Sequence, residues 1–481
     1  MSTYAAAMAS AGFSLTARTG AAQTLALASP VLAPTVVNTM LLGGADLRFL
    51  FAPEPGTEYA RKYWEARSAL YHATVAEAEL YSSYEAVWQD LYLPVTAGET
   101  VFGIHRSAGW LKSQFDAGRA AIIANVRGSQ NRRHDHSQLI VNTGDPNATA
   151  YITDRDGWGG RLAEAIDAAT EVIDAARTVA VTRDVTTFCH GRDPADRNAR
   201  TVHAPDTRNF SLSRGKGNVG SPNSSLARAL TSYYAELRRQ SGDQPDNWPY
   251  RKFLQHEASI RAFGDALAER LQALSPEQPA ALRDLYSPGL GLTSTYFGRQ
   301  CASLYDSVLA SDLFSLRVAS AEYGGWDTHR IERSRFETNI EDVLGTGGGL
   351  ATLDAALEWI PGARENLTYI FTTDFGRQIA ANGDHGTDHG RGNYTIVMGE
   401  AVRGGTYGEM FPESEIVGGE GQTRYDQLGS DIEGLTAFEN VLYEICEWVE
   451  PGTGATVAPE AAAGSLPVEP GVDLSTLFNS V

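Results

Sequence analysis

Three short segments of the chain place aspartate and histidine beside glycine, each near the carboxyl end of a predicted strand. They are Gly-Gly-Trp-Asp-Thr-His-Arg at 324–330, Thr-Thr-Asp-Phe-Gly-Arg at 372–377 and Asp-His-Gly-Thr-Asp-His-Gly-Arg at 384–391. In a parallel α/β sheet the carboxyl ends of the strands share one edge, and ligands gather there. Carboxylate oxygens and imidazole nitrogens are common ligands of divalent metals. The segments therefore predict an α/β fold that gathers these side chains around metal.

Short apolar runs alternate with segments of helical periodicity along most of the chain. This alternation predicts an α/β fold with a central, mainly parallel sheet and helices on both faces. The predicted strands are 35–42, 120–126, 178–182, 314–321, 367–373 and 394–399. The predicted helices are 59–71, 160–177, 224–240, 249–273, 293–311, 330–344, 350–360 and 432–449.

The 481 residues suit one large α/β domain, which we place at 35–450. Within it, residues 186–224 are rich in Arg, Asp, Asn, Ser and Gly and predict a polar surface excursion. Residues 1–34 are small and apolar, and they predict a degenerate leader or an N-terminal arm. Residues 451–481 are rich in Pro, Ala and Gly and predict a docked or flexible tail.

Composition narrows the classes of partner. The formal net charge of −20 and the pI of 4.9 argue against nucleic acid or an anionic membrane surface. No apolar run reaches the roughly 18 residues of a transmembrane helix. The three cysteines, Cys189, Cys301 and Cys446, are far apart, which disfavours both a disulfide framework and a thiolate zinc site.

Asp327 and His329 are the first pair of predicted metal ligands. They are separated by one residue, so in extended backbone both point the same way. The alternative for Asp327 is a cap on the helix that begins near His329. Asp374 follows a buried strand, where it can bind metal or cap a helix. Asp46 follows Gly43-Gly44 at the end of the first strand, where it can bind metal or form an Asx turn. Such ligands suit one or two ions of Zn, Mn, Mg or Ca.

In the segment 384–391, His389 is the preferred metal ligand. His385 or Asp388 can orient a ring nitrogen of a ligating histidine from behind it. The alternative is an exposed polar turn. Arg377, soon after Asp374, can bind an anionic oxygen of a substrate or make a surface salt bridge.

A fourth polar cluster lies at 132–137 (Arg-Arg-His-Asp-His-Ser). It can supply a ligand, a general acid or base, or a hydroxyl nucleophile, and we take His136 and Ser137 as the catalytic candidates. Arg133 is a second candidate for substrate binding. The alternative is a solvated polar loop.

The order of motifs resembles that of the bacterial domain-of-unknown-function family 1501. The motifs are Gly-Gly-x-Asp at 43–46, the loop histidine His136, Gly-Trp-x-Gly-Arg at 157–161, Gly-x-Asp-Thr-His at 325–329, Asp-Phe-Gly-Arg at 374–377, Gly-Thr-Asp-His-Gly at 386–390 and Arg-Gly-Gly-x-Tyr-Gly at 403–408. That family is grouped with the alkaline phosphatase and sulfatase superfamily. The resemblance implies a mixed sheet and a two-metal hydrolase-like site.

In that pattern, Asp46 and Asp374 resemble the ligands of one metal, and Asp327, His329 and His389 those of the other. Many family members carry a twin-arginine export leader, which implies a periplasmic or extracellular place. No twin arginine precedes the apolar start of this chain, so the cytoplasm is the alternative location. The chain also has Asp-His-Ser at 135–137 where the family usually has Ser-His-Phe, and it has no clear nucleophile after Asp46.

Two main functions follow as expectations. The first is a metal-dependent hydrolase that cleaves a small phosphate or sulfate ester, or a phosphorylated or sulfated polymer. The second is a non-catalytic envelope or extracellular protein that keeps the fold for binding or assembly with a protein partner. A third reading is a structural calcium site.

Overall fold

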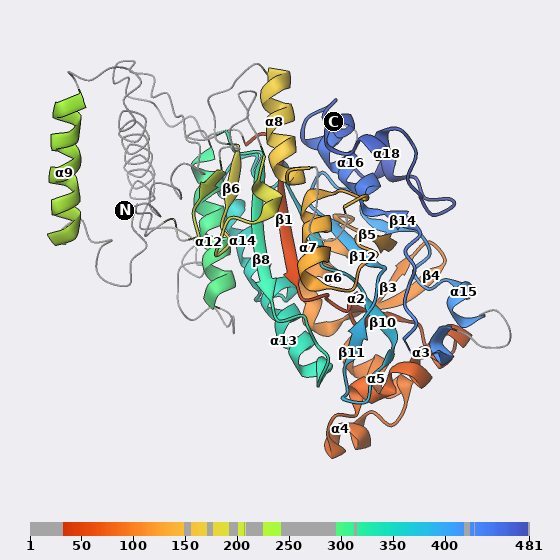
Figure 1. Cartoon of the computed structure of the whole chain (residues 1–481). Helices are drawn as coiled ribbons and strands as arrows, with labels where there is room; N and C mark the ends of the chain where they lie inside the picture. The colour runs from red at the N-terminus through yellow and green to blue at the C-terminus, as the bar shows by residue number, and fades with distance from the viewer. Residues whose placement is uncertain are drawn as a thin grey trace.

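The computed structural model describes residues 32–148, 155–170, 177–191, 201–205, 207, 225–241, 295–311, 315–417, 424–427 and 429–479. Residues 1–31 of the predicted N-terminal leader or arm, the predicted helix at 249–273 and most of the polar excursion lie outside these residues. Within them, helices cover both faces of one large sheet (Figure 1).

The main sheet has nine strands in the order β13-β5-β12-β9-β1-β8-β6-β7, with β14 also paired to β5. β12 pairs antiparallel with both of its neighbours, and the other pairs are parallel. This confirms the predicted α/β class with a mainly parallel sheet. The strands are β1 (Thr35–Leu42), β5 (Ala120–Arg127), β6 (Thr178–Ala180), β7 (Thr201–His203), β8 (Val318–Gly324), β9 (Leu367–Thr373), β12 (Asn393–Met398), β13 (Gly405–Tyr407) and β14 (Thr436–Ala437).

β1 lies at the centre of this sheet, paired along its length with β8 and β9. Val36 and Met40 pack into the core on one face, and Val37 and Leu41 into the core on the other. This period of two follows from the alternation of side chains along a strand. Burial of each such side chain contributes roughly 1.5–3 kcal/mol, so the central strand needs apolar residues on both faces.

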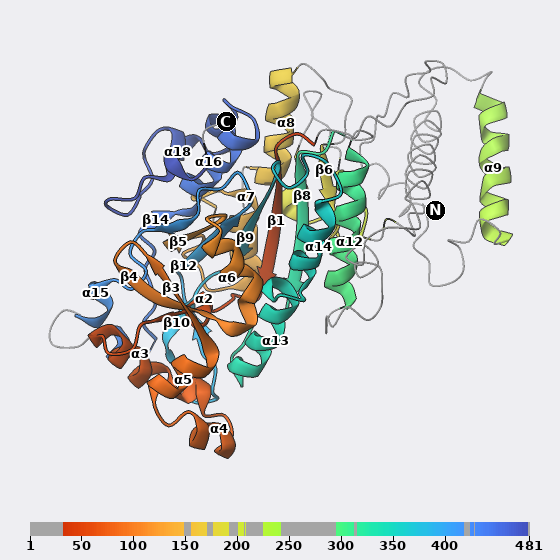
Figure 2. The ribbon, with the colours of Figure 1, turned by 180° about the vertical axis from the view of Figure 1, so that it is seen from behind.

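Helices from distant parts of the chain form the two outer layers, which Figures 1 and 2 show from opposite sides. One face is covered by α7 (His134–Thr143), α8 (Trp158–Thr170) and α16 (Phe438–Val449). The other is covered by α6 (Gly109–Asp116), α12 (Thr295–Leu309), α13 (Glu332–Leu344) and α14 (Gly349–Leu357). The polar cluster at 132–137, for which a solvated loop was the alternative, thus runs into helix α7.

A smaller sheet in the order β2-β4-β3 was not predicted. Its strands and the helices around it are β2 (Phe51–Pro53), β3 (Tyr92–Ala97), β4 (Thr100–His105), α2 (Leu47–Leu50), α3 (Glu58–Arg67), η1 (Ser68–Tyr71), α4 (Val75–Leu80), α5 (Tyr84–Leu91) and η2 (Arg106–Ala108). The hairpin of β10 (Arg377–Ala381) and β11 (Thr387–His389) was also not predicted.

The described part of the C-terminal tail packs against α16. Leu474 and Leu477 are buried in the same core as that helix, and the Phe478 ring stacks on Trp448 with 5.0 Å between ring centroids. The tail contains α17 (Gly454–Val457), α18 (Pro459–Ala462) and η8 (Leu474–Thr476). The remaining elements are η3 (Thr187–Cys189), α9 (Ser225–Ser241), α15 (Glu413–Ile416) and η7 (Arg424–Asp426).

Among the described residues, no helix is both long and apolar enough to cross a membrane.

Candidate metal centre

The chain gathers its Asp and His side chains beyond the carboxyl ends of three parallel strands and in one hairpin. Asp327 and His329 follow β8, Asp374 follows β9, and His134 starts α7 after β5. His389 is the last residue of β11, in the hairpin between β9 and β12. Asp327 carries 46% of its side-chain surface exposed, so the cluster opens to solvent.

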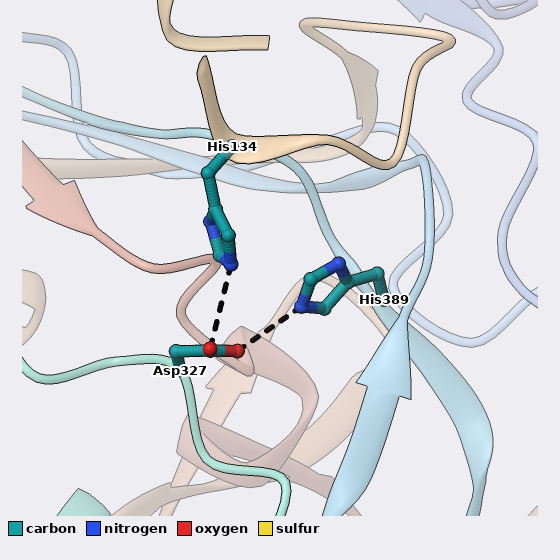
Figure 3. Close-up of side chains that lie close together, drawn as sticks. All are labelled: His134, Asp327 and His389. Atoms are coloured by element: carbon teal, nitrogen blue, oxygen red, sulfur yellow. Dashed lines mark hydrogen bonds and ion pairs between the residues drawn. The ribbon is translucent and has the colours of Figure 1, made fainter. Parts of the chain in front are cut away.

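Three imidazole Nε2 atoms converge on the Asp327 carboxylate. His389 Nε2 lies 3.0 Å and His329 Nε2 3.1 Å from Asp327 Oδ1, and His134 Nε2 lies 3.4 Å from Oδ2. Figure 3 shows His134 and His389 pointing at this carboxylate from two sides. His134, Asp327 and His389 each offer one ligand atom, and these atoms all lie within 4.8 Å of one another, so the three residues could together hold a metal ion.

Each histidine is held through its other ring nitrogen. His329 Nδ1 donates to Asp388 Oδ1 at 3.0 Å, and His134 Nδ1 donates to Asp374 Oδ2 at 2.7 Å. His389 Nδ1 donates to the Arg132 carbonyl at 2.8 Å. A proton on Nδ1 leaves the Nε2 lone pair free, which is how proteins orient histidine for metal.

The donor set fits a divalent ion. His329 Nε2 and His389 Nε2 are 2.8 Å apart, and both are lone-pair atoms when the two Nδ1 atoms donate. Two acceptors at that distance repel each other. A cation between them and Asp327 Oδ1 would replace this repulsion with three ligand bonds. Imidazole suits Zn, Fe, Co, Ni or Cu better than Mg or Ca, which prefer all-oxygen shells.

Local electrostatics keep Asp327 ionised and favour neutral His389, which are the forms that bind metal. Burial would raise the pKa of Asp327, but the hydrogen bond from the Arg377 guanidinium and the contact with His389 outweigh it and hold the value at about 2. Burial lowers the pKa of His389, which favours neutral imidazole. The hydrogen bond to Asp374 raises the pKa of His134.

Arg377 does not lie where a substrate could reach it. The residue is 2% exposed, and its guanidinium donates to Gly44 O at 2.7 Å, Thr387 O at 3.0 Å and Asp327 Oδ1 at 2.8 Å. It also donates to the carbonyls of Gly43 and Trp326. The predicted contact with substrate is therefore replaced by one that fixes Asp327 between the ends of β1 and β8.

Asp46 is not brought together with the histidine cluster. Its carboxylate caps α2, accepting from the backbone N–H of Arg48 at 3.1 Å and of Phe49 at 3.3 Å, and forms an ion pair with Arg67. Both partners of that pair are buried. Arg67 thus neutralises the charge that the two-metal pattern assigned to an ion.

Asp374 lies behind the cluster. It is fully buried and accepts from Gly43 N at 3.2 Å and from Gln138 Nε2 at 3.1 Å, in addition to His134. The structure thus assembles Asp327, His329 and His389 as the sequence predicted. The pairing of Asp46 with Asp374 at a second ion is not assembled.

The two catalytic candidates on α7 point away from the cluster. The buried Ser137 hydroxyl donates to Asn131 O at 2.8 Å, and His136 Nδ1 lies 2.7 Å from Asn131 Nδ2. In a helix, residues i and i+2 face different sides, so His134 reaches the cluster and His136 does not. The i, i+4 pair of His134 and Gln138, which shares Asp374, was the signal that could have identified the ligand.

The remaining predicted residues divide between rim and support. Arg133 has an exposed side chain, 3.4 Å from Asp135, at the start of α7. Asp388 lies against His329 Nδ1, as a ligand-orienting residue would. His385 does not: its Nδ1 donates to Ala69 O at 2.8 Å, and its backbone has a φ of 59°.

Comparison with known proteins finds a family model that matches part of the chain. No curated protein matches the chain. Residues 235–438 match a family model, and this segment carries Asp327, His329, Asp374 and His389 but not His134. The match supports the family that the order of motifs implied, whose description is "Protein of unknown function (DUF1501)".

Proposed function

We propose that this protein is a metal-dependent hydrolase of phosphate or sulfate esters, with one ion held by Asp327, His329, His389 and His134. The observation that carries the proposal is the convergence of three oriented imidazoles on one carboxylate. Holding these side chains in fixed rotamers costs conformational entropy. Bonds to a metal ion would offset that cost.

The proposed site has one ion rather than two. Asp46 is already neutralised by Arg67, and Asp374 is occupied by His134, Gln138 and the Gly43 N–H. When bound, a divalent ion supplies Lewis-acid polarisation of an ester oxygen and acidifies water. Asp388, Asp374 and the Arg132 carbonyl fix the imidazoles, and Arg377 keeps Asp327 ionised and in place.

His134 differs from the other two histidines. It is the furthest from Asp327, and its pKa is raised by Asp374. These properties suit a group that holds a proton for the leaving oxygen when it is not a ligand. The exposed face of Asp327 lets a substrate approach from solvent.

Metal analysis of the full chain after dialysis tests the proposal. We expect about one zinc-like ion per chain, hydrolysis of an aryl phosphate or aryl sulfate, and loss of both in Asp327→Asn and His389→Ala. His190→Ala removes an exposed histidine outside the cluster and is the matched control. Dialysed protein that holds no metal and cleaves neither ester would refute the proposal.

The second candidate is a binding or assembly protein that retains the fold without turnover. The observation that favours it is Ser137, whose hydroxyl is buried against Asn131 and cannot attack an ester at the cluster. An ion that binds at the cluster with no turnover of either ester would support this candidate. From the family resemblance, we propose that the protein works in the periplasm or outside the cell.

A further inference from the structure

Two arginines beside the histidine cluster share one buried carboxylate. Arg132 Nη2 lies 2.7 Å from Asp431 Oδ2, and Arg391 Nη2 lies 3.3 Å from Asp431 Oδ1. Asp431 has 2% of its side-chain surface exposed, whereas each arginine has 38% exposed. The carboxylate is thus the fixed centre, and the two guanidinium groups reach outward from it.

The pair is attached directly to His389. The Arg132 carbonyl accepts the His389 Nδ1 proton at 2.8 Å. Asp431 packs against the residue after this histidine, because a Cβ added at Gly390 would lie 3.0 Å from the Asp431 Cβ. Arg391 follows Gly390, and its carbonyl accepts from Gly376 N at 3.1 Å. Both arginines therefore flank the segment that carries one of the proposed ligands.

The charges at this place do not cancel. Two guanidinium groups face one carboxylate, so one positive charge remains at the rim of the cluster, although the chain as a whole carries −20. Arg48 and Arg67, by contrast, are buried and pair with carboxylates that are buried as well. Those pairs are structural. Arg132 and Arg391 instead keep part of their surface in solvent.

Donors also remain. A guanidinium has five N–H groups. Among the described residues, Asp431 is the only side chain that Arg132 or Arg391 binds. Two guanidinium groups with spare donors match the several oxygens of a tetrahedral oxyanion, which arginine binds with forked, charge-assisted contacts.

We propose that Arg132 and Arg391 form an anion subsite that binds the phosphate or sulfate group of a substrate beside His389. Asp431 is a positioning residue that holds the two guanidinium groups side by side. This inference deepens the proposed function and rests on it for the identity of the substrate. It replaces Arg377 with Arg132 and Arg391 as the residues that select an anionic ester.

Calorimetric titration of the full chain with inorganic phosphate and with sulfate tests the subsite. We expect Arg132→Gln and Arg391→Gln each to weaken binding of the preferred anion by about tenfold, since each removes one charge-assisted contact. Each single variant leaves one arginine on Asp431, so the buried carboxylate keeps a partner. Arg330→Gln removes an exposed arginine that lies 3.9 Å from Asp384 and does not contact Asp431, and it should bind like the unaltered protein.

Metal content and thermal unfolding are measured on the same samples, with and without chelator. Weaker anion binding by both variants at unchanged metal content and fold would support the subsite. Equal binding by the two variants and Arg330→Gln, or no binding of either anion by the unaltered chain, would overturn it. A chain without metal that still binds phosphate through these arginines would refute the hydrolase and keep the subsite.

Discussion

At the scale of single residues, the second nitrogen of each imidazole decides what the first can do. His329 depends on Asp388, His134 on Asp374, and His389 on a backbone carbonyl that no side-chain substitution removes. Of these supports, Asp388 is the easiest to remove cleanly, because its side chain is half-exposed and its loss leaves no buried charge.

We expect Asp388→Asn to weaken metal affinity by about 10- to 100-fold, as loss of an orienting partner usually does. The amide oxygen of the variant side chain is a weaker acceptor than the carboxylate, so the His329 ring would be held less firmly towards Asp327. Competition with a fluorescent zinc chelator measures the change. Asp384→Asn alters an exposed carboxylate of the same hairpin and should bind metal normally. Equal affinities for the two variants would contradict this account of His329.

The same scale shows what local sequence could and could not reveal. Asp327, His329 and His389 were predicted to converge because each lies beside glycine at the end of a strand. His134 was passed over for His136, since the choice depends on a helix starting at the first of the two. The sequence around 134 has no capping side chain at Arg133 to mark that start.

At the scale of elements, α3 shows how a carboxylate predicted to bind metal is used in the fold instead. Arg67, on the last turn of α3, is fully buried and pairs with Asp46 at the start of α2. Its guanidinium also donates to Ile379 O at 2.8 Å, which ties α3 to strand β10. The pair therefore joins three elements next to the cluster.

Arg67→Met should lower the free energy of unfolding by about 3–5 kcal/mol, because Asp46 would stay buried without its partner. Chemical denaturation measures the loss. Arg61→Met, on the exposed face of the same helix, should unfold close to the unaltered protein. A companion variant, Asp46→Asn, should keep its metal. Loss of metal in that variant with the fold intact would restore Asp46 as a ligand.

Helix α16 carries a buried glutamate, Glu439. Burial raises its pKa to about 7, so the folded protein holds this proton more tightly than the unfolded chain. The free energy of unfolding should therefore fall as the pH rises from about 4.5 towards about 7. Glu439→Gln should flatten this fall in denaturation curves. Glu433→Gln, at an exposed position, should leave it unchanged; a fall that persists in Glu439→Gln would place the proton elsewhere.

Elements were predictable where the pattern of apolar residues was unambiguous. The bounds of β1 and β9 agree with the predicted strands at 35–42 and 367–373. The small sheet was missed because β3 contains Pro94, which a strand tolerates at a sheet edge but which reads as a breaker in the sequence. β11 is three residues, Thr-Asp-His, too short and polar to show a period.

At the scale of the whole molecule, the C-terminal tail is part of the core rather than an appendage. Leu477 is fully buried in the cluster that lies under α16. Composition rich in Pro, Ala and Gly left docking and flexibility equally open, because docking depends on a few apolar anchors and not on the average. Leu477→Ala should cost about 2–5 kcal/mol of unfolding free energy, measured by denaturation. Leu435→Ala, at a site 42% exposed, is the control; equal stability of the two would mean that the tail is detached in solution.

The reversed direction of β12 has a consequence for how this architecture can vary. Because β9 and β12 are antiparallel neighbours, the chain leaves β9 and enters β12 at the same end of the sheet. The β10–β11 hairpin, which carries His389, therefore connects these two strands without crossing a face of the sheet. Its tip can lengthen or shorten while β9 and β12 keep their positions. We therefore expect homologues to differ most in length at this hairpin, and to differ there in the substrates that they accept.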